Sequence, residues 1–185
     1  ESGVLVRPYT NDQDVYDLLK VVAGEPAVPA PPYDWAERRI TSVKNDPQGR
    51  AHVDSFASVV KVWLFDDVGA DAGPLHIVRG SHRHTRDRLA WEHARANGRE
   101  ALVEPSFRLT SNESDAGDAA AFVARCQRDA EPIVTHTPIV VVADPSLVHF
   151  RGAGRVGTVR RSRRLRGDNG GGLARRNPFR FADEE

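Results

Sequence analysis

The sequence predicts a β-sandwich or barrel supported by a few helices. Short segments rich in Val, Ile, Phe and Trp recur along the chain, which is typical of strands. Segments rich in Gly, Pro, Asp and Asn separate them and indicate turns. The 185 residues contain no internal repeat and no break in composition, so we expect a single domain over residues 1–185.

The N-terminal part predicts one helix before the first strand. Asn11 or Asp12 can cap it, and Val15, Leu18 and Leu19 follow at helical spacing, so we expect a helix over residues 12–22. The segments that follow are a Pro- and Ala-rich loop over 23–32, a stretch compatible with either helix or strand over 35–43, and a turn over 45–49.

The strongest strand signal covers residues 53–65, where Val, Phe and Trp alternate across two faces. Further strands are expected over residues 75–78, 102–110, 132–137, 139–143 and 147–150. Helices are expected over residues 89–97 and 119–128, a polar loop over 111–118 and a Gly-rich linker over 167–172.

Composition argues against several classes of protein. The formal net charge is +0, which disfavours a dedicated nucleic-acid or membrane-surface protein. Cys126 is the single cysteine, so an internal disulfide is impossible and a cytoplasmic protein is expected. No apolar run reaches the ~20 residues of a membrane span. The sequence assigns no oligomeric state.

Three residues have the chemistry of a metal site. His52 and Asp54 are separated by one residue, so on an extended strand their side chains point to the same face. His149 ends a second predicted strand far downstream. Two imidazoles and one carboxylate form the facial triad of non-haem Fe(II) oxygenases, which leaves positions open for chemistry. A polar pair on a strand edge is the alternative interpretation of His52 and Asp54.

Several motifs, taken in order, resemble the phytanoyl-CoA dioxygenase family of Fe(II)- and 2-oxoglutarate-dependent oxygenases. They are HVD at 52–54, VWLFDD at 62–67, GPLHIVRGSH at 73–82, LVH at 147–149 and Arg160. The third motif is the most specific, although Arg79 stands where proline is usual. The resemblance spans about residues 44–166.

The resemblance implies a double-stranded β-helix, a cupin-like jelly roll that is mainly β with supporting helices. Its core would cover residues 44–166, between an N-terminal helical and loop region over 1–43 and a Gly-rich tail over 167–185. The implied activity is that of an Fe(II)/2-oxoglutarate-dependent dioxygenase, an oxidoreductase. It would use O2 to hydroxylate or otherwise oxidise a small molecule and release succinate and CO2.

The resemblance also assigns the site residues. Those that match the family's iron ligands are His52, Asp54 and His149. Arg160 matches the residue that binds the far carboxylate of 2-oxoglutarate, because a guanidinium pairs with a carboxylate through two parallel hydrogen bonds. Arg161 competes for this role, since a one-residue slip reverses the face of a strand. Lys44 and Ser42 are further candidates to hold the cosubstrate.

Two other classes of function stay open. One is a cupin-like metal-binding protein of the same fold without oxygenase turnover. The other is a nucleic-acid-binding module built on the basic run over residues 160–166, which the neutral net charge and the lack of interleaved aromatic residues disfavour. Candidate substrates are small molecules, including secondary metabolites and acyl- or phosphate-bearing compounds.

Overall fold

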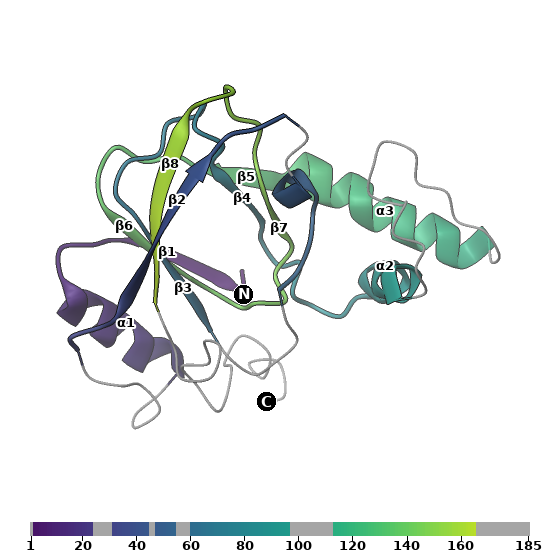
Figure 1. Cartoon of the computed structure of the whole chain (residues 1–185). Coiled ribbons are helices and arrows are strands. Elements are labelled where there is room, and N and C mark those ends of the chain that lie inside the picture. The colour runs from purple at the N-terminus through teal and green to yellow at the C-terminus, as the bar shows by residue number, and fades with distance from the viewer. Residues whose placement is uncertain (1, 24–30, 45–46, 55–59, 97–112, 166–185) are drawn as a thin grey trace.

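The computed structural model describes residues 2–23, 31–44, 47–54, 60–96 and 113–165 (Figure 1). The larger sheet contains, in spatial order, β1 (Val4–Pro8), β6 (Ile139–Ala143), β3 (Lys61–Phe65), β8 (Val159–Leu165) and β2 (Trp35–Thr41). The smaller sheet contains β5 (Ala130–Ile133), β4 (Leu75–Val78) and β7 (His149–Arg151). The helices are α1 (Asp12–Ala23), α2 (Arg86–Ala96), α3 (Glu113–Asp129) and the short 3-10 helix η1 (Pro47–Gly49).

The order in which the chain visits the two sheets defines the fold. From β2 in the larger sheet, the chain reaches His52, which pairs with β7 of the smaller sheet, and then returns as β3. It continues through β4 and β5 in the smaller sheet, β6 in the larger, β7 in the smaller and β8 in the larger. All of these named strands pair in antiparallel fashion. This alternation is that of a jelly roll, so the predicted fold class is confirmed.

Apolar side chains fill the space between the sheets on the side of β1, β6 and β3. Trp63 and Phe65 of β3 cluster there with Leu75 and Ile77 of β4. The opposite face of β3 is also covered, because Val62 packs against the apolar side of α1 (Figure 1). Burial on both faces explains why β3 is an almost continuous apolar run.

The two remaining helices form a separate pair beside the smaller sheet (Figure 1). Trp91 of α2 packs against Phe122 of α3, with 5.1 Å between ring centroids, and Val78 of β4 joins the same cluster. Arg88 of α2 is fully buried and donates to the backbone carbonyls of Ser81 and Ser146. The helix pair is therefore fastened to the loops that precede α2 and β7.

Several predicted elements are confirmed. The helix over 12–22 is α1, and the strands over 75–78 and 139–143 have the predicted bounds. The ambiguous segment over 35–43 forms a strand, β2. The predicted helices over 89–97 and 119–128 lie largely within α2 and within α3, and the strands over 132–137 and 147–150 overlap β5 and β7.

Two predicted elements differ from the structure. The strand predicted over 53–65 is confirmed from Lys61 to Phe65 as β3, whereas Val53 and Asp54 are not in a strand and residues 55–59 lie outside the described part of the chain. The loop over 111–118 is wrong from Glu113 onward, where α3 begins. Packing of the following turns against α2 supports this helix despite its polar start. The predicted strand over 102–110 and the tail over 167–185 lie outside the described residues.

Two strands of the larger sheet, β1 and β8, are not among the strands predicted from the sequence. Strand β1 is a short apolar run at the sheet edge. Strand β8 reads VRRSRRL and lacks the alternation of apolar and polar residues that marks a half-buried strand. Among the described helices, none is both long and apolar enough to span a membrane.

Asp12, at the start of α1, fastens the helix to the edge of the larger sheet. Its carboxylate accepts hydrogen bonds from the Trp35 indole N–H (2.8 Å), the Tyr33 backbone N–H (3.1 Å) and the Tyr9 hydroxyl (3.1 Å). Partial burial raises the pKa of Asp12, but these hydrogen bonds outweigh it and hold the pKa below its ordinary 3.8.

We expect Asp12→Ala to lower the free energy of unfolding by about 1–2 kcal/mol at pH 7, because three donors lose a charged acceptor. The folded-state pKa is depressed, so this stabilisation is complete above pH 3.8 and is lost as the pH falls through the folded-state pKa. Urea unfolding at pH 7 and pH 3 measures both effects. Asp17→Ala, on the exposed side of the same helix, is the matched control; an equal loss there would contradict the assignment.

Candidate metal centre

His52 is paired directly with His149 of β7 in an antiparallel bridge. The His52 N–H donates to the His149 carbonyl and the His149 N–H donates back, both at 3.0 Å. Such a doubly bonded antiparallel pair places both side chains on the same face of the sheet. The two imidazole rings consequently lie 4.5 Å apart between centroids. The pairing of two strands far apart in sequence therefore brings two candidate ligands together.

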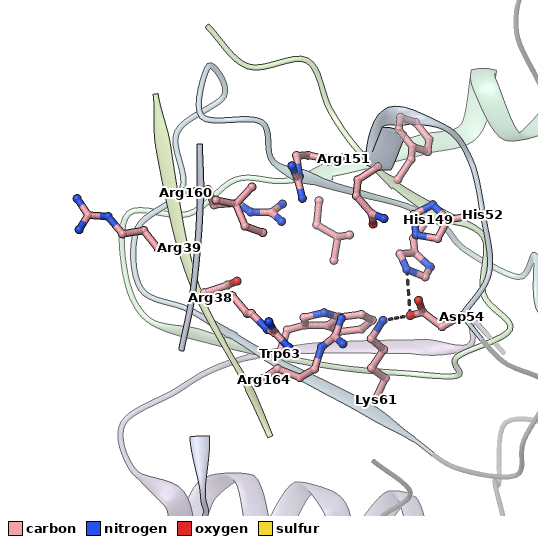
Figure 2. A pocket seen from close by; sticks show the side chains of 15 residues that line it. Arg38, Arg39, His52, Asp54, Lys61, Trp63, His149, Arg151, Arg160 and Arg164 are labelled. Carbon is pink, nitrogen blue, oxygen red and sulfur yellow. Dashed lines mark ion pairs between the residues drawn. The ribbon is translucent and has the colours of Figure 1, made fainter. Parts of the chain in front are cut away.

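Asp54 completes the group, as the spacing of the His-x-Asp motif predicts. Its backbone N–H donates to the Pro145 carbonyl at 2.9 Å, which holds this segment beside the loop that leads to β7. Its Oδ2 lies 3.2 Å from the Nε2 of His149 (Figure 2). One donor atom from each of His52, Asp54 and His149 lies within 4.8 Å of the others.

Backbone carbonyls orient both imidazoles for metal binding. The Nδ1 of His52 lies 2.7 Å from the Arg50 carbonyl, and the Nδ1 of His149 lies 2.9 Å from the Leu147 carbonyl. Because a carbonyl only accepts, each Nδ1 carries the hydrogen, and in the neutral ring Nε2 keeps its lone pair. This is the arrangement that orients metal-binding histidines in proteins.

The charge state of His149 also suits a metal ligand. Burial, together with the nearby charge of Lys61, lowers the pKa of His149 to about 4, so the ring is neutral at pH 7. A neutral Nε2 and a carboxylate oxygen of Asp54 then stand 3.2 Å apart as two acceptors. A shared cation would turn this unfavourable contact into a favourable one. The donor set therefore fits a divalent metal ion.

Lys61 is a site residue that the sequence reasoning missed. Its ammonium contacts Oδ2 of Asp54 and lies over the Trp63 ring, 4.6 Å from the centroid. Burial and the charge of Arg164 lower the pKa of Lys61 to about 7. A signal for Lys61 exists in the sequence, since it is the one charged residue of the apolar strand KVWLF.

A cavity of about 410 Å³ lies between the sheets beside the three candidate ligands. Its cationic lining residues are Arg38, Arg39, Lys61, Arg151, Arg160 and Arg164. Figure 2 shows Arg39 pointing away from the others. Among the described residues, Asp54 is the only acidic one in the lining, so this part of the cavity is strongly positive and suits an anionic ligand.

Of the two arginines proposed for 2-oxoglutarate, Arg160 lines this cavity. It is 7% exposed, and its Nη1 donates to the Gly73 carbonyl at 3.0 Å. Arg161 is exposed and does not line the cavity. Neither Ser42 nor Lys44, both described, belongs to the lining: Ser42 is buried beside Thr158, and Lys44 is exposed. A cosubstrate role for these two residues has no support from their position.

Comparison with family models gives no match, and comparison with curated proteins gives none either. The resemblance to the phytanoyl-CoA dioxygenase family therefore stays a prediction. Among solved structures, AviO1 from Streptomyces viridochromogenes is similar, with 22% identity and a TM-score of 0.36 over 72% of this chain and 44% of that chain. This chain thus spans less than half the length of AviO1.

Two further similar structures contain iron, according to their descriptions. HygX from Streptomyces hygroscopicus with iron bound has 12% identity and a TM-score of 0.43, over 89% of this chain and 81% of that chain. The non-heme iron oxygenase OrfP in complex with Fe has 13% identity and a TM-score of 0.43, over 88% and 73% of the two chains. These similarities are too distant to assign a function.

Proposed function

We propose that this protein is a non-haem oxygenase that uses Fe(II), 2-oxoglutarate and O2 to oxidise a small molecule. The observation that carries the proposal is the convergence of His52, Asp54 and His149, whose donor atoms lie within 4.8 Å of one another beside the cavity. Two imidazoles and one carboxylate with open positions are the donor set of non-haem Fe(II) oxygenases.

The number of protein ligands supports a catalytic rather than a structural metal site. Within the described part of the chain, the cluster of candidate ligands has three members. A structural zinc site is usually closed by four protein ligands, whereas three leave room for exogenous ligands. The ion would be held by the Nε2 atoms of His52 and His149 and by the carboxylate of Asp54.

Arg160 supports the choice of a dicarboxylate cosubstrate. Its guanidinium is buried in the cavity wall, where a charge-assisted pair with a carboxylate is stronger than in water. It would bind the far carboxylate of 2-oxoglutarate and so orient the cosubstrate toward the metal ligands. Trp63 and Leu75 line the same cavity and are 7% and 6% exposed, so they give it an apolar part of the wall.

When bound, Fe(II) with 2-oxoglutarate and O2 supplies an oxidising power that no amino-acid side chain has. The chain contributes the remaining requirements. His149 and His52 would present nitrogen donors and Asp54 a negative oxygen donor. The pairing of His52 with His149 and the hydrogen bond from the Asp54 N–H to the Pro145 carbonyl hold the three residues together. The Lys61 ammonium offsets the negative charge of Asp54 and holds its carboxylate in place.

The structure of β8 disfavours the nucleic-acid alternative. Residues of the basic run alternate between two faces, so Arg160 and Arg164 line the cavity. Arg163, on the other face, donates to Asp66 at 2.7 Å. Within the described residues the run is thus not one continuous basic surface, which a phosphate backbone would require.

An anaerobic titration with Fe(II) and then 2-oxoglutarate tests the proposed function. We expect a visible charge-transfer band when the cosubstrate chelates the iron. The band should be lost in Asp54→Ala and kept in Asp67→Ala, whose carboxylate is 73% exposed and pairs with His136. If iron binds without a band in the unmodified protein, the oxygenase proposal fails and the cupin-like metal-binding alternative is favoured.

A further inference from the structure

Arg38 and Arg164 are neighbours on the cavity side of the larger sheet. In the register of β2 and β8, Arg38 faces Ser162 and Ala36 faces Arg164. The two arginines are therefore diagonal partners on the same face, within reach of each other for long side chains. Both line the cavity, and Arg164 is directly opposite Trp63 in the register of β3 and β8.

The described residues do not balance this pair of positive charges: neither Arg38 nor Arg164 forms an ion pair with a described carboxylate. Asp54, the one acid among the described lining residues, contacts Lys61. Partial burial lowers the pKa of Arg164, and the charge of Arg38 lowers it further, so the two cations repel each other. A bound anion would relieve this repulsion.

The pair is separate from Arg160. Arg160 and Arg164 are four positions apart on β8, which corresponds to about 13 Å along an extended strand. In Figure 2, Arg160 is drawn in the upper part of the view, whereas Arg38 and Arg164 are drawn in the lower part. In the proposed function, the metal held by His52, Asp54 and His149 would take one end of 2-oxoglutarate, and Arg160 would bind its far carboxylate. The charges of Arg38 and Arg164 then remain for another ligand.

We propose that Arg38 and Arg164 form a second anion subsite, which binds a carboxylate or phosphate group of the substrate. The substrate would then be an anionic small molecule, with the body next to its charged group packed on the Trp63 ring. The assignment of the anion to the substrate rests on the proposed function. The existence of the subsite does not, because it depends only on the two arginines and the cavity they line.

Calorimetric titration of the iron-free protein with inorganic phosphate, and separately with acetate, tests the subsite. We expect the affinity for at least one of these anions to fall ~10-fold or more in Arg164→Gln and in Arg38→Gln. Arg161→Gln is the matched control, because it removes the same charge from the face of the same strand that does not line the cavity. It should bind both anions as the unmodified protein does. The tighter anion of the two identifies the charged group of the substrate.

Arg38 lies on the exposed edge strand, so Arg38→Gln should fold normally even if Arg164→Gln is destabilised. The proposal is overturned if neither substitution weakens anion binding. It is also overturned if Arg161→Gln weakens it equally, or if only Arg160→Gln does. The charge-transfer band with Fe(II) and 2-oxoglutarate should persist in Arg38→Gln. If Arg38→Gln loses anion binding but keeps the band, the subsite is separate from the cosubstrate site. If the unmodified protein gives no band but its anion binding still depends on the two arginines, only the oxygenase proposal fails.

Discussion

Replacing His149 with alanine is expected to weaken Fe(II) binding by at least ~100-fold, because one of the three proposed protein ligands disappears. His149 is the most constrained of the three: it is 5% exposed, and the Leu147 carbonyl holds its Nδ1 at 2.9 Å. The charge-transfer band and succinate formation should be lost together. Competition with a metal-chelating dye measures the Fe(II) affinity directly.

The matched control is His136→Ala. That imidazole is 79% exposed and pairs with Asp67. Its removal should leave the Fe(II) affinity unchanged, and both variants should retain the β-rich circular dichroism spectrum of the unmodified protein. Unaltered Fe(II) binding in His149→Ala would remove this residue from the ligand set and with it the proposed site.

Replacing Arg160 with glutamine should weaken 2-oxoglutarate binding by about 10- to 100-fold, because a charge-assisted pair in the cavity wall is lost. The Fe(II) affinity should not change, since Arg160 is not among the clustered metal-ligand candidates. Titration of the charge-transfer band with 2-oxoglutarate at saturating Fe(II) measures the effect.

Arg161→Gln supplies the control for this prediction as well. Arg161 follows Arg160 directly on β8 but is exposed, so its substitution should leave 2-oxoglutarate binding unaltered. If the two variants behave in the opposite way, the cosubstrate binds to the other face of β8, and Arg160 is only a structural residue that donates to Gly73.

The parts of the fold that the sequence predicted well are those whose local pattern agrees with their environment. The helix α1 has a capping residue and one apolar face that packs on the sheet. Strand β6 is a short run of β-branched residues buried on both faces. In these cases periodicity and burial carry the same information.

Strand β8 shows why other elements escaped prediction. In this strand the positions that face the space between the sheets are polar, namely Arg160, Ser162 and Arg164. They line a charged cavity instead of an apolar core, so apolar alternation is absent. The role of Lys61 also depends on the cavity, because this residue lines it from the first position of an otherwise apolar strand.

The sequence by itself determined the candidate ligands, because the spacing of His52 and Asp54 is local and residues two apart on extended backbone share a face. It also indicated a mainly β fold through its short β-branched segments. Only the tertiary structure decided that His149 pairs with His52, that Arg160 rather than Arg161 lines the cavity, and that Arg38 joins Arg164. These relations depend on the register between strands far apart in the chain, which no local pattern specifies.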